Sequence, residues 1–282
     1  MKKIFKKRIL AVVLSCFTLM NVIALPVHAS TVNETEPNNT RETAMTITAN
    51  RETPAQAVSG NRPNEYVVDG STSANDEDWY KVYLNAGVQY VTLNGGTLSF
   101  EVYEEDSEFP IIARQYQKTG FGGTAYRFNA TTAGFYYVCI HTNLSSSQDY
   151  LMLVGDPTYD VISCTVNLDS VTMSGSDQNV SFNLVNETSI PEGAIVYSMA
   201  VRGVRTTAVD GIAVRNITSG NTVNMDRYTW SKSGLVSLSM PVRGSWRITF
   251  EYSKNTTFTP YVVFQCVYPV TSVYAEDITI TP

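Results

Sequence analysis

The stretch Asp76-Glu-Asp-Trp-Tyr-Lys-Val-Tyr-Leu84 predicts a β-strand, because three acidic residues lead into a run with an apolar side chain at every second position. Tyr80, Val82 and Leu84 carry this alternation, and residues so spaced share one face of a β-strand. The range 135–141 repeats the pattern. We therefore predict that both ranges are strands with one face turned into a core.

Further strand-like runs, separated by turn residues, occur at spacings typical of β-sandwiches. In the first half they are 55–58, 66–69, 79–84, 88–93, 98–103, 111–116, 125–128, 135–141 and 150–154. In the second half they are 161–168, 180–184, 194–201, 212–217, 222–225, 235–240, 245–252 and 261–270. We predict an all-β protein with two antiparallel β-sandwich domains, 30–156 and 157–282, the second open to an Ig-like arrangement.

The N-terminus has the pattern of an export signal. The basic residues Lys2, Lys3, Lys6, Lys7 and Arg8 come first, a mostly apolar run covers 9–25, and Val27-His-Ala29 offers small residues for cleavage. We predict a secretory signal peptide over 1–29 and a secreted, extracellular protein. A retained membrane anchor is the less favoured alternative, because Asn21 and Pro26 interrupt a short run; no later run approaches the roughly 20 apolar residues that a span needs.

Charge limits the partners. After residue 29 the chain has 15 Lys+Arg and 26 Asp+Glu, a formal net charge of −11. This balance argues against nucleic acid or an anionic membrane as a partner, and it leaves acidic clusters available for cations.

Three cysteines follow the leader, so at least one is unpaired within the chain. Cys164 and Cys266 lie on strand-like runs near the two ends of the second half, and Cys139 lies in the first half. A Cys164–Cys266 disulfide would join the first and last strands of that domain, and we predict it, with two buried thiols as the open alternative.

Oxygen-bearing side chains gather in two places. Glu34-Thr-Glu-Pro-Asn-Asn39 supplies four of them, and Asp76 and Asp78 stand at the start of a predicted strand. Oxygen ligands, several of them anionic, suit a hard cation such as calcium. Taken alone, the same residues are more typical of solvated tails and turns, which loops carry routinely.

Four pieces in order resemble the bacterial pre-peptidase C-terminal (PPC) domain family over roughly residues 32–154. They are the acidic opening 34–44, the short run Val58-Ser-Gly60, the strand entry 76–82, and Ala133-Gly-Phe-Tyr-Tyr-Val138 followed by Tyr150-Leu-Met-Leu153.

This resemblance implies a small jelly-roll-like β-sandwich of the kind appended to secreted peptidases, including collagenases, where members bind calcium and sometimes substrate. It implies these calcium ligands: Glu34, Glu36, Asn38, Asn39, Asp76 and Asp78. Asn39 departs from the aspartate of several members and lowers the site charge by one. Cys139 and His141 stand where collagenase modules present an aromatic collagen-binding strand, which argues against collagen as the target.

Familiar catalytic patterns are missing from the sequence. His141 is the only histidine after the leader, which excludes HExxH and multi-histidine zinc sites, and GxSxG and P-loop patterns are absent. Cys139 and His141 share a strand face, but parallel side chains disfavour a Cys–His dyad.

Two groups of polar residues could form functional sites, but we favour an ordinary solvent-exposed surface for both. The acidic group 104–108 suits a solvated turn better than a glycosidase pair. Four arginines of the second half could line a glycan or anion surface with two aromatic residues, although scattered surface arginines are the favoured interpretation. These six residues are Arg202, Arg205, Arg215, Arg243, Tyr228 and Trp230.

The sequence thus predicts a secreted, non-catalytic, calcium-binding β-sandwich protein. Its expected role is binding or accessory work on an extracellular protein, glycan or cell-wall component. An enzyme of unrecognised type, or an accessory chain of a separate secreted peptidase, is the alternative.

Overall fold

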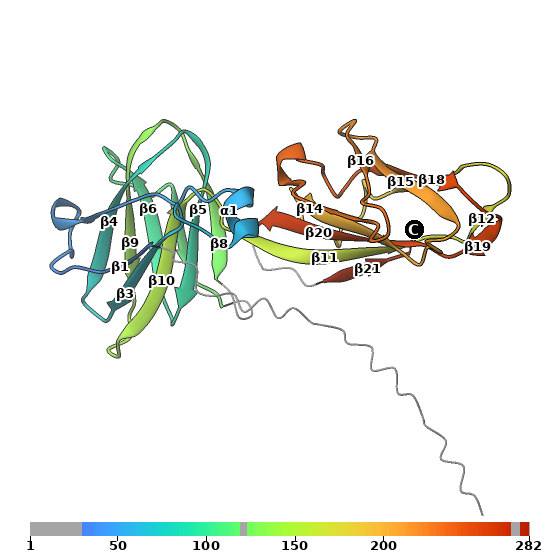
Figure 1. Cartoon of the computed structure of the whole chain (residues 1–282). Coiled ribbons are helices and arrows are strands. Elements are labelled where there is room, and N and C mark those ends of the chain that lie inside the picture. Colours follow the sequence, from blue (N-terminus) through green and yellow to red (C-terminus); the bar gives the residue numbers. More distant parts are fainter. Residues whose placement is uncertain (1–29, 119–122, 272–276, 282) are drawn as a thin grey trace, which may run out of the picture.

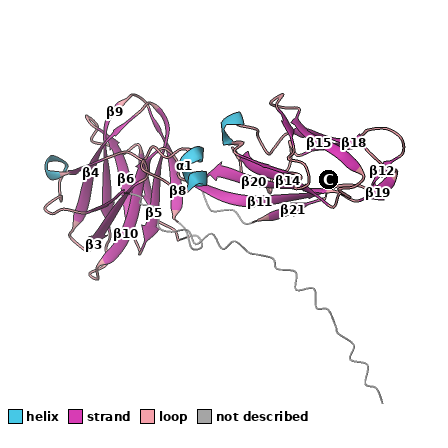
Figure 2. Cartoon of the chain, in the orientation of Figure 1, coloured by secondary structure: helices cyan, strands magenta, loops and turns pink. Residues whose placement is uncertain are grey.

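The computed structural model describes residues 30–118, 123–271 and 277–281. The predicted signal peptide, 1–29, lies outside these residues. Strands make up most of what is described, with only short helical turns between them (Figure 2). No helix in these ranges has the length and apolar character needed to cross a bilayer.

The first half is a sandwich of two five-stranded sheets (Figure 1). One sheet has the order β1 (Ser30–Asn33), β3 (Tyr66–Thr72), β10 (Gln148–Gly155), β5 (Gly87–Gly95), β8 (Thr124–Ala130). The other has the order β2 (Met45–Ile47), β4 (Glu77–Leu84), β9 (Gly134–His141), β6 (Ser99–Glu104), β7 (Ile112–Gln115). All neighbours are antiparallel except β1 with β3 and β2 with β4, which are parallel.

The core of this half forms as the alternation predicts. Tyr80, Val82 and Leu84 of β4 are fully buried, and the inward positions of β9 meet them in one apolar cluster. The remaining face of β4 and β9 points outward, since neighbouring residues of a strand face opposite ways.

The second half is also a sandwich of two facing sheets. One sheet has the order β17 (Ser231–Ser233), β14 (Ile195–Arg202), β20 (Tyr261–Pro269), β11 (Tyr159–Asn167), β21 (Ile278–Ile280). The facing sheet has the order β13 (Gln178–Asn183), β18 (Ser245–Tyr252), β15 (Val209–Asn216), β16 (Thr222–Asn224). β12 (Val171–Met173) pairs with β19 (Thr256–Phe258) at one end.

Aromatic side chains fill the second core. Trp246 of β18 is fully buried; its ring centroid lies 4.6 Å from that of Phe264 and 6.5 Å from that of Phe182. The indole Nε1 donates to Val242 O at 3.1 Å, so the one polar group of this side chain has a partner inside the core. The prediction of an all-β chain built of β-sandwiches is confirmed.

Two predicted strands are wrong. Residues 55–58 lie in helix α1 (Pro54–Ser59), because Thr53 and Gln56 form a capping box, proline takes the first turn, and Gly60 ends the helix at φ 72°. In 235–240, residues Val236–Leu238 form the 3-10 turn η2. Both runs are short and apolar, and such runs do not distinguish strand from turn by periodicity.

The Cys164–Cys266 disulfide predicted from the sequence is not formed. Both are buried free thiols, as is Cys139. β11 and β20 are neighbours in register, with Cys164 opposite Phe264 and Cys266 opposite Ile162, so the two cysteines are diagonal. Diagonal Cα atoms lie about 7–8 Å apart, and a disulfide needs usually less than about 6.8 Å.

The two halves meet at the segment that precedes α1. Asn50 exchanges backbone hydrogen bonds with the β10 end: its N–H donates to Val154 O at 2.7 Å, and Asp156 N–H donates to Asn50 O at 3.0 Å. Tyr159, the first residue of β11, donates its N–H to Glu52 Oε2 at 3.0 Å. Helix α1 packs against β11 and β20, at the place where the two sandwiches adjoin in Figure 1.

Candidate metal centre

Three of the predicted ligands come together. Glu34, Glu36 and Asp78 each place a carboxylate oxygen within 4.8 Å of the others. Two of these residues lie just after β1 and the third lies near the start of β4, so the cluster joins segments more than 40 residues apart. Asp78 is fully buried, whereas Glu36 is exposed, so the cluster runs from the interior to the surface.

Backbone hydrogen bonds hold the acidic segment on the sandwich. Glu34 N–H donates to Asp69 O of β3 at 2.9 Å, and Trp79 N–H of β4 donates to Asn38 O at 2.9 Å. A capping box between Thr40 and Thr43 then closes the 3-10 turn η1 (Arg41–Thr43). The segment is therefore bound to strands of both sheets.

Asn38 connects the acids to one another. Its backbone N–H donates to Glu36 Oε2 at 2.9 Å, and its side-chain Nδ2 donates to Glu34 Oε1 at 2.9 Å. With Nδ2 so directed, the amide oxygen Oδ1 is left to face another partner.

A chain of four oxygens crosses the interior side of the site. Tyr80 Oη lies 2.7 Å from Glu34 Oε1 and 2.6 Å from Tyr150 Oη, which lies 2.7 Å from Asp78 Oδ2. Three hydrogen bonds need three protons, and the two phenols supply two. The third must come from a carboxyl group, so at these distances one carboxyl group holds a proton.

Asp78 is that group on electrostatic grounds. Burial raises its pKa to about 8; the Tyr150 hydroxyl opposes this shift, and the charges of Glu34, Asp76 and Glu36 add to it. The pKa of Asp76 is also raised, first by desolvation and then by Glu34. The site thus holds more negative charge than its surroundings can stabilise.

Two oxygens in the site are buried without a hydrogen-bond partner among the described residues: Asn38 Oδ1 and Asp78 Oδ1. Buried polar atoms normally have a partner, and leaving one without a partner costs about 1–3 kcal/mol. Two orphan oxygens beside two further carboxylates form an all-oxygen donor set, which is the set that calcium takes. The residues present therefore fit a calcium ion.

The other predicted ligands differ in position. Asp76 lies near enough for its charge to raise the pKa of Asp78, although its carboxylate is outside the close cluster. Asn39 is exposed and takes no part in the hydrogen bonds described above, so its role as a ligand stays a prediction.

Tyr80 and Tyr150 are site residues that the sequence did not reveal. Alternation correctly places Tyr80 in the core, but it gives no sign that the hydroxyl reaches Glu34. An abundance of tyrosine at inward strand positions was the one available signal, because a buried phenol usually needs a polar partner.

An open hollow of about 370 Å³ adjoins the cluster at the surface. It is lined by Glu34 and Glu36 together with Asp69, Gly70, Ser71, Asn33 and Asp149. Its acidic wall gives a cation a favourable approach to the exposed side of the cluster.

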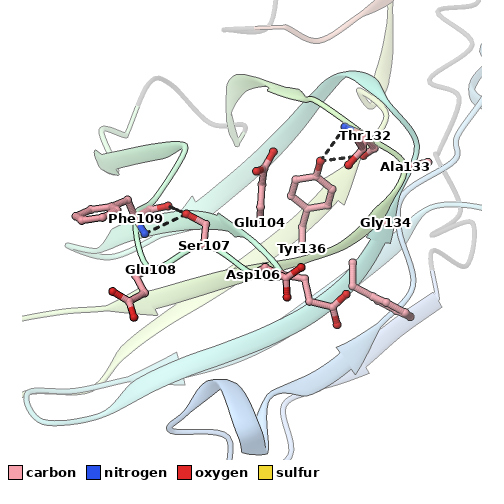
Figure 3. Close-up of a pocket in the computed structure, with 11 residues that line it drawn as sticks. Glu104, Asp106, Ser107, Glu108, Phe109, Thr132, Ala133, Gly134 and Tyr136 are labelled. Atoms are coloured by element: carbon pink, nitrogen blue, oxygen red, sulfur yellow. Dashed lines mark hydrogen bonds between the residues drawn. The ribbon is translucent and has the colours of Figure 1, made fainter.

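A second acidic group lies apart from this centre. Figure 3 shows Glu104, Asp106 and Glu108 around a pocket of about 590 Å³. Thr131 Oγ1 donates to Glu104 Oε1 at 2.5 Å, and Lys81 Nζ lies 2.7 Å from Glu105 Oε1. No orphan buried oxygen of the described residues faces this pocket, which distinguishes it from the first cluster.

Cys139 and His141 share the outer face of β9, as predicted. Cys139 is 2% exposed, and burial, followed by the charges of Glu77 and Glu101, raises the pKa of its thiol strongly. A nucleophilic cysteine needs the opposite shift.

No family model and no curated protein matches the chain. Among solved structures, the chain is similar to a proposed secreted protein from Eubacterium rectale (9% identity, TM-score 0.47, 88% of this chain and 90% of that one). It is also similar to the pre-peptidase C-terminal domain of a collagenase from Bacillus anthracis (17% identity, TM-score 0.29, 39% of this chain and 93% of that one). A third likeness is to the periplasmic g-type lysozyme inhibitor PliG of Aeromonas hydrophila (15% identity, TM-score 0.24, 39% and 98%). At these TM-scores the function is argued from the residues alone.

Proposed function

We propose that this protein is a secreted, non-catalytic binding module whose first sandwich carries a structural calcium ion. The observation that supports the ion best is the pair of buried, unpartnered oxygens, Asn38 Oδ1 and Asp78 Oδ1, beside the carboxylates of Glu34 and Glu36. A calcium ion would satisfy both oxygens and balance the charge that raises the pKa of Asp78.

The ion would join two parts of the chain. Glu34 and Glu36 belong to the segment after β1, and Asp78 belongs to β4 of the other sheet. Calcium would therefore fasten the N-terminal segment across the end of the sandwich. Its role is structural, because every ligand is a protein oxygen held by the fold and the site lacks an activated nucleophile.

The non-catalytic role rests on the chemistry of the best nucleophile candidate. Cys139 is buried, its thiol has a raised pKa, and its neighbour His141 lies on the same strand face rather than opposite it. The expected target is an extracellular protein, glycan or cell-wall component. Work as an accessory chain of a secreted peptidase falls within the same proposal.

Calcium should raise the melting temperature of residues 30–282 relative to the same protein in chelator. An ion that binds only the folded state at 100 times Kd adds about 2.7 kcal/mol, or roughly 5–10 °C for a protein of this size. Magnesium should substitute poorly, because it requires tighter octahedral geometry.

Asp78→Ala should abolish most of this calcium shift, since it deletes the buried anionic ligand. Glu108→Ala removes the same charge from the other acidic group and should keep the full shift. Equal melting temperatures in calcium and chelator for the unmodified protein would reject the site, as would an unchanged shift in Asp78→Ala.

A further inference from the structure

The outer face of the sheet β13-β18-β15-β16 holds two arginines in direct opposition. Arg215 of β15 is the cross-strand partner of Arg247 of β18, and both side chains are exposed. Directly opposed residues on antiparallel strands have Cβ atoms about 4.5–5.5 Å apart, and like charges so placed destabilise the sheet. β15 and β18 are the upper strands of the right-hand body in Figure 1, on the side away from β11 and β20.

No built-in counter-ion relieves this pair. Among the described residues, neither guanidinium forms an ion pair; the nearest acid along β18 is Glu251, four residues or about 13 Å from Arg247. The Glu251 carboxylate is directed at Gly211 instead, where it occupies the space that a Cβ atom would take.

Two of the other predicted arginines bond to the backbone of loops, and the third, Arg205, lies in the loop between β14 and β15, outside the opposed pair. Arg202 Nη1 donates to Thr229 O at 2.6 Å, and Arg243 Nε donates to Ile190 O at 2.8 Å. These two arginines fasten loops. Of the arginines predicted from the sequence to line an anion surface, only Arg215 therefore remains a candidate, and its cross-strand partner Arg247 is a new one.

Short polar side chains surround the pair in register. Ser181 lies beside Arg247, and Thr222 lies beside Arg215, so one row reads Ser-Arg-Arg-Thr across four strands. The next row contains Asn179, Thr249, Ala213 and Asn224. These two rows therefore offer hydroxyl and amide groups on a flat surface, and the nearest exposed apolar residue along this chain segment is Ile217, directly after β15.

We propose that this face binds a linear anionic polysaccharide. The guanidinium pair would take an acidic group of the chain through paired N–H donors, which suit carboxylate, sulfate and phosphate groups. The surrounding amides and hydroxyls would bond sugar hydroxyls. A protein partner fits less well, because protein interfaces depend on buried aromatic and large apolar anchors, and the two rows contain none of these. The site is independent of the proposed calcium ion.

The test uses residues 30–282 and immobilised dextran sulfate, with uncharged dextran as the matched polymer. The protein should bind dextran sulfate and not dextran. Binding should weaken between about 0.1 M and about 1 M salt, where the Debye length falls from about 10 Å to about 3 Å.

The double variant R215Q/R247Q should lose about tenfold or more in affinity, since hydrogen bonds to charged groups are the strong ones. The control R205Q/K254Q removes two positive charges from exposed positions outside these rows and should bind as the unmodified protein does. R215K/R247K keeps the charge without the planar fork and should fall between them. Circular dichroism of all variants confirms that each is folded.

Several outcomes would overturn the proposal. They are no binding to dextran sulfate, equal binding to dextran, or an equal loss in R205Q/K254Q. Tighter arginine-dependent binding to poly-glutamate would assign the face to an acidic polypeptide instead. Arginine-dependent self-association in sedimentation velocity would assign it to the acidic first half of a second copy.

Discussion

At Asp78, burial and charge oppose each other. Its carboxyl is fully buried, one oxygen lacks a partner, and its pKa is raised to about 8. Such a group destabilises the fold unless a proton or a cation balances it. We propose that a calcium ion provides this balance.

Tyr150→Phe tests the oxygen chain at this scale. It removes the hydroxyl that lies 2.7 Å from Asp78 Oδ2, so a buried acceptor loses its partner. We expect a loss of about 1–3 kcal/mol in the free energy of unfolding and a smaller calcium-dependent rise in melting temperature.

Tyr116→Phe is the matched control. Its hydroxyl is also buried but has no hydrogen-bond partner among the residues that the structure describes, so its removal should leave stability unchanged or slightly higher. If both variants behave alike in chelator and in calcium, the oxygen chain does not support the site. Urea unfolding with and without calcium measures both the free energy of unfolding and its dependence on calcium.

At the scale of the strand, the local sequence pattern predicts which face of a strand is buried, whereas the pairing of distant strands decides which segments meet. Alternation in 76–84 correctly predicts the inward face of β4, because one buried face imposes a period of two. It could not predict that β4 and the segment after β1 meet, since that contact depends on the pairing of distant strands. The spacing of the acidic residues therefore predicted candidate metal ligands, whereas the hydrogen bonds of Tyr80 and Tyr150 to these acids could be found only in the folded structure.

The cysteines show the same limit. Each lies on a correctly predicted strand, and both face the core of the second half. Bond formation depends on register, and the register of β11 with β20 makes the two cysteines diagonal rather than opposed. The strand predicted over 55–58 is wrong for a different reason. The capping box of Thr53 and Gln56, which indicates a helix start, is visible in the sequence, but the prediction gave more weight to the short apolar run.

The opposed arginines make an element-scale prediction of their own. Arg215→Gln and Arg247→Gln should each raise the free energy of unfolding by about 0.2–1 kcal/mol at low salt. The double variant should gain less than the sum, because either change alone removes the repulsion. Additive or destabilising effects in urea unfolding would show that the pair is not under strain.

At the scale of the whole molecule, Glu52 links the two sandwiches. It lies in the first half, is 3% exposed, and accepts from the N–H of Tyr159 at the start of β11. Arg62 Nη1 lies 3.2 Å from its other oxygen, Oε1. Desolvation raises the pKa of Glu52 to about 7; Arg62 and the Tyr159 N–H oppose this shift, and Glu65 and Asp160 add to it.

This shift predicts a stability that falls with pH. The folded protein holds the Glu52 proton more tightly than the unfolded chain, so the contribution to stability is full below the pKa of about 4.5 in the unfolded chain and is lost as pH rises through about 7. The loss is at most about 3 kcal/mol. Glu52→Gln keeps an acceptor for Tyr159 and should flatten urea midpoints between about pH 4.5 and pH 8. Equal slopes in both proteins would contradict the assignment.

The most direct test of the central claim is a crystal structure of residues 30–282 grown with calcium. We expect one calcium ion with ligand distances of about 2.3–2.6 Å to Glu34, Glu36, Asp78 and Asn38 Oδ1. An empty cluster at saturating calcium, or an ion bound only among Glu104, Asp106 and Glu108, would contradict it.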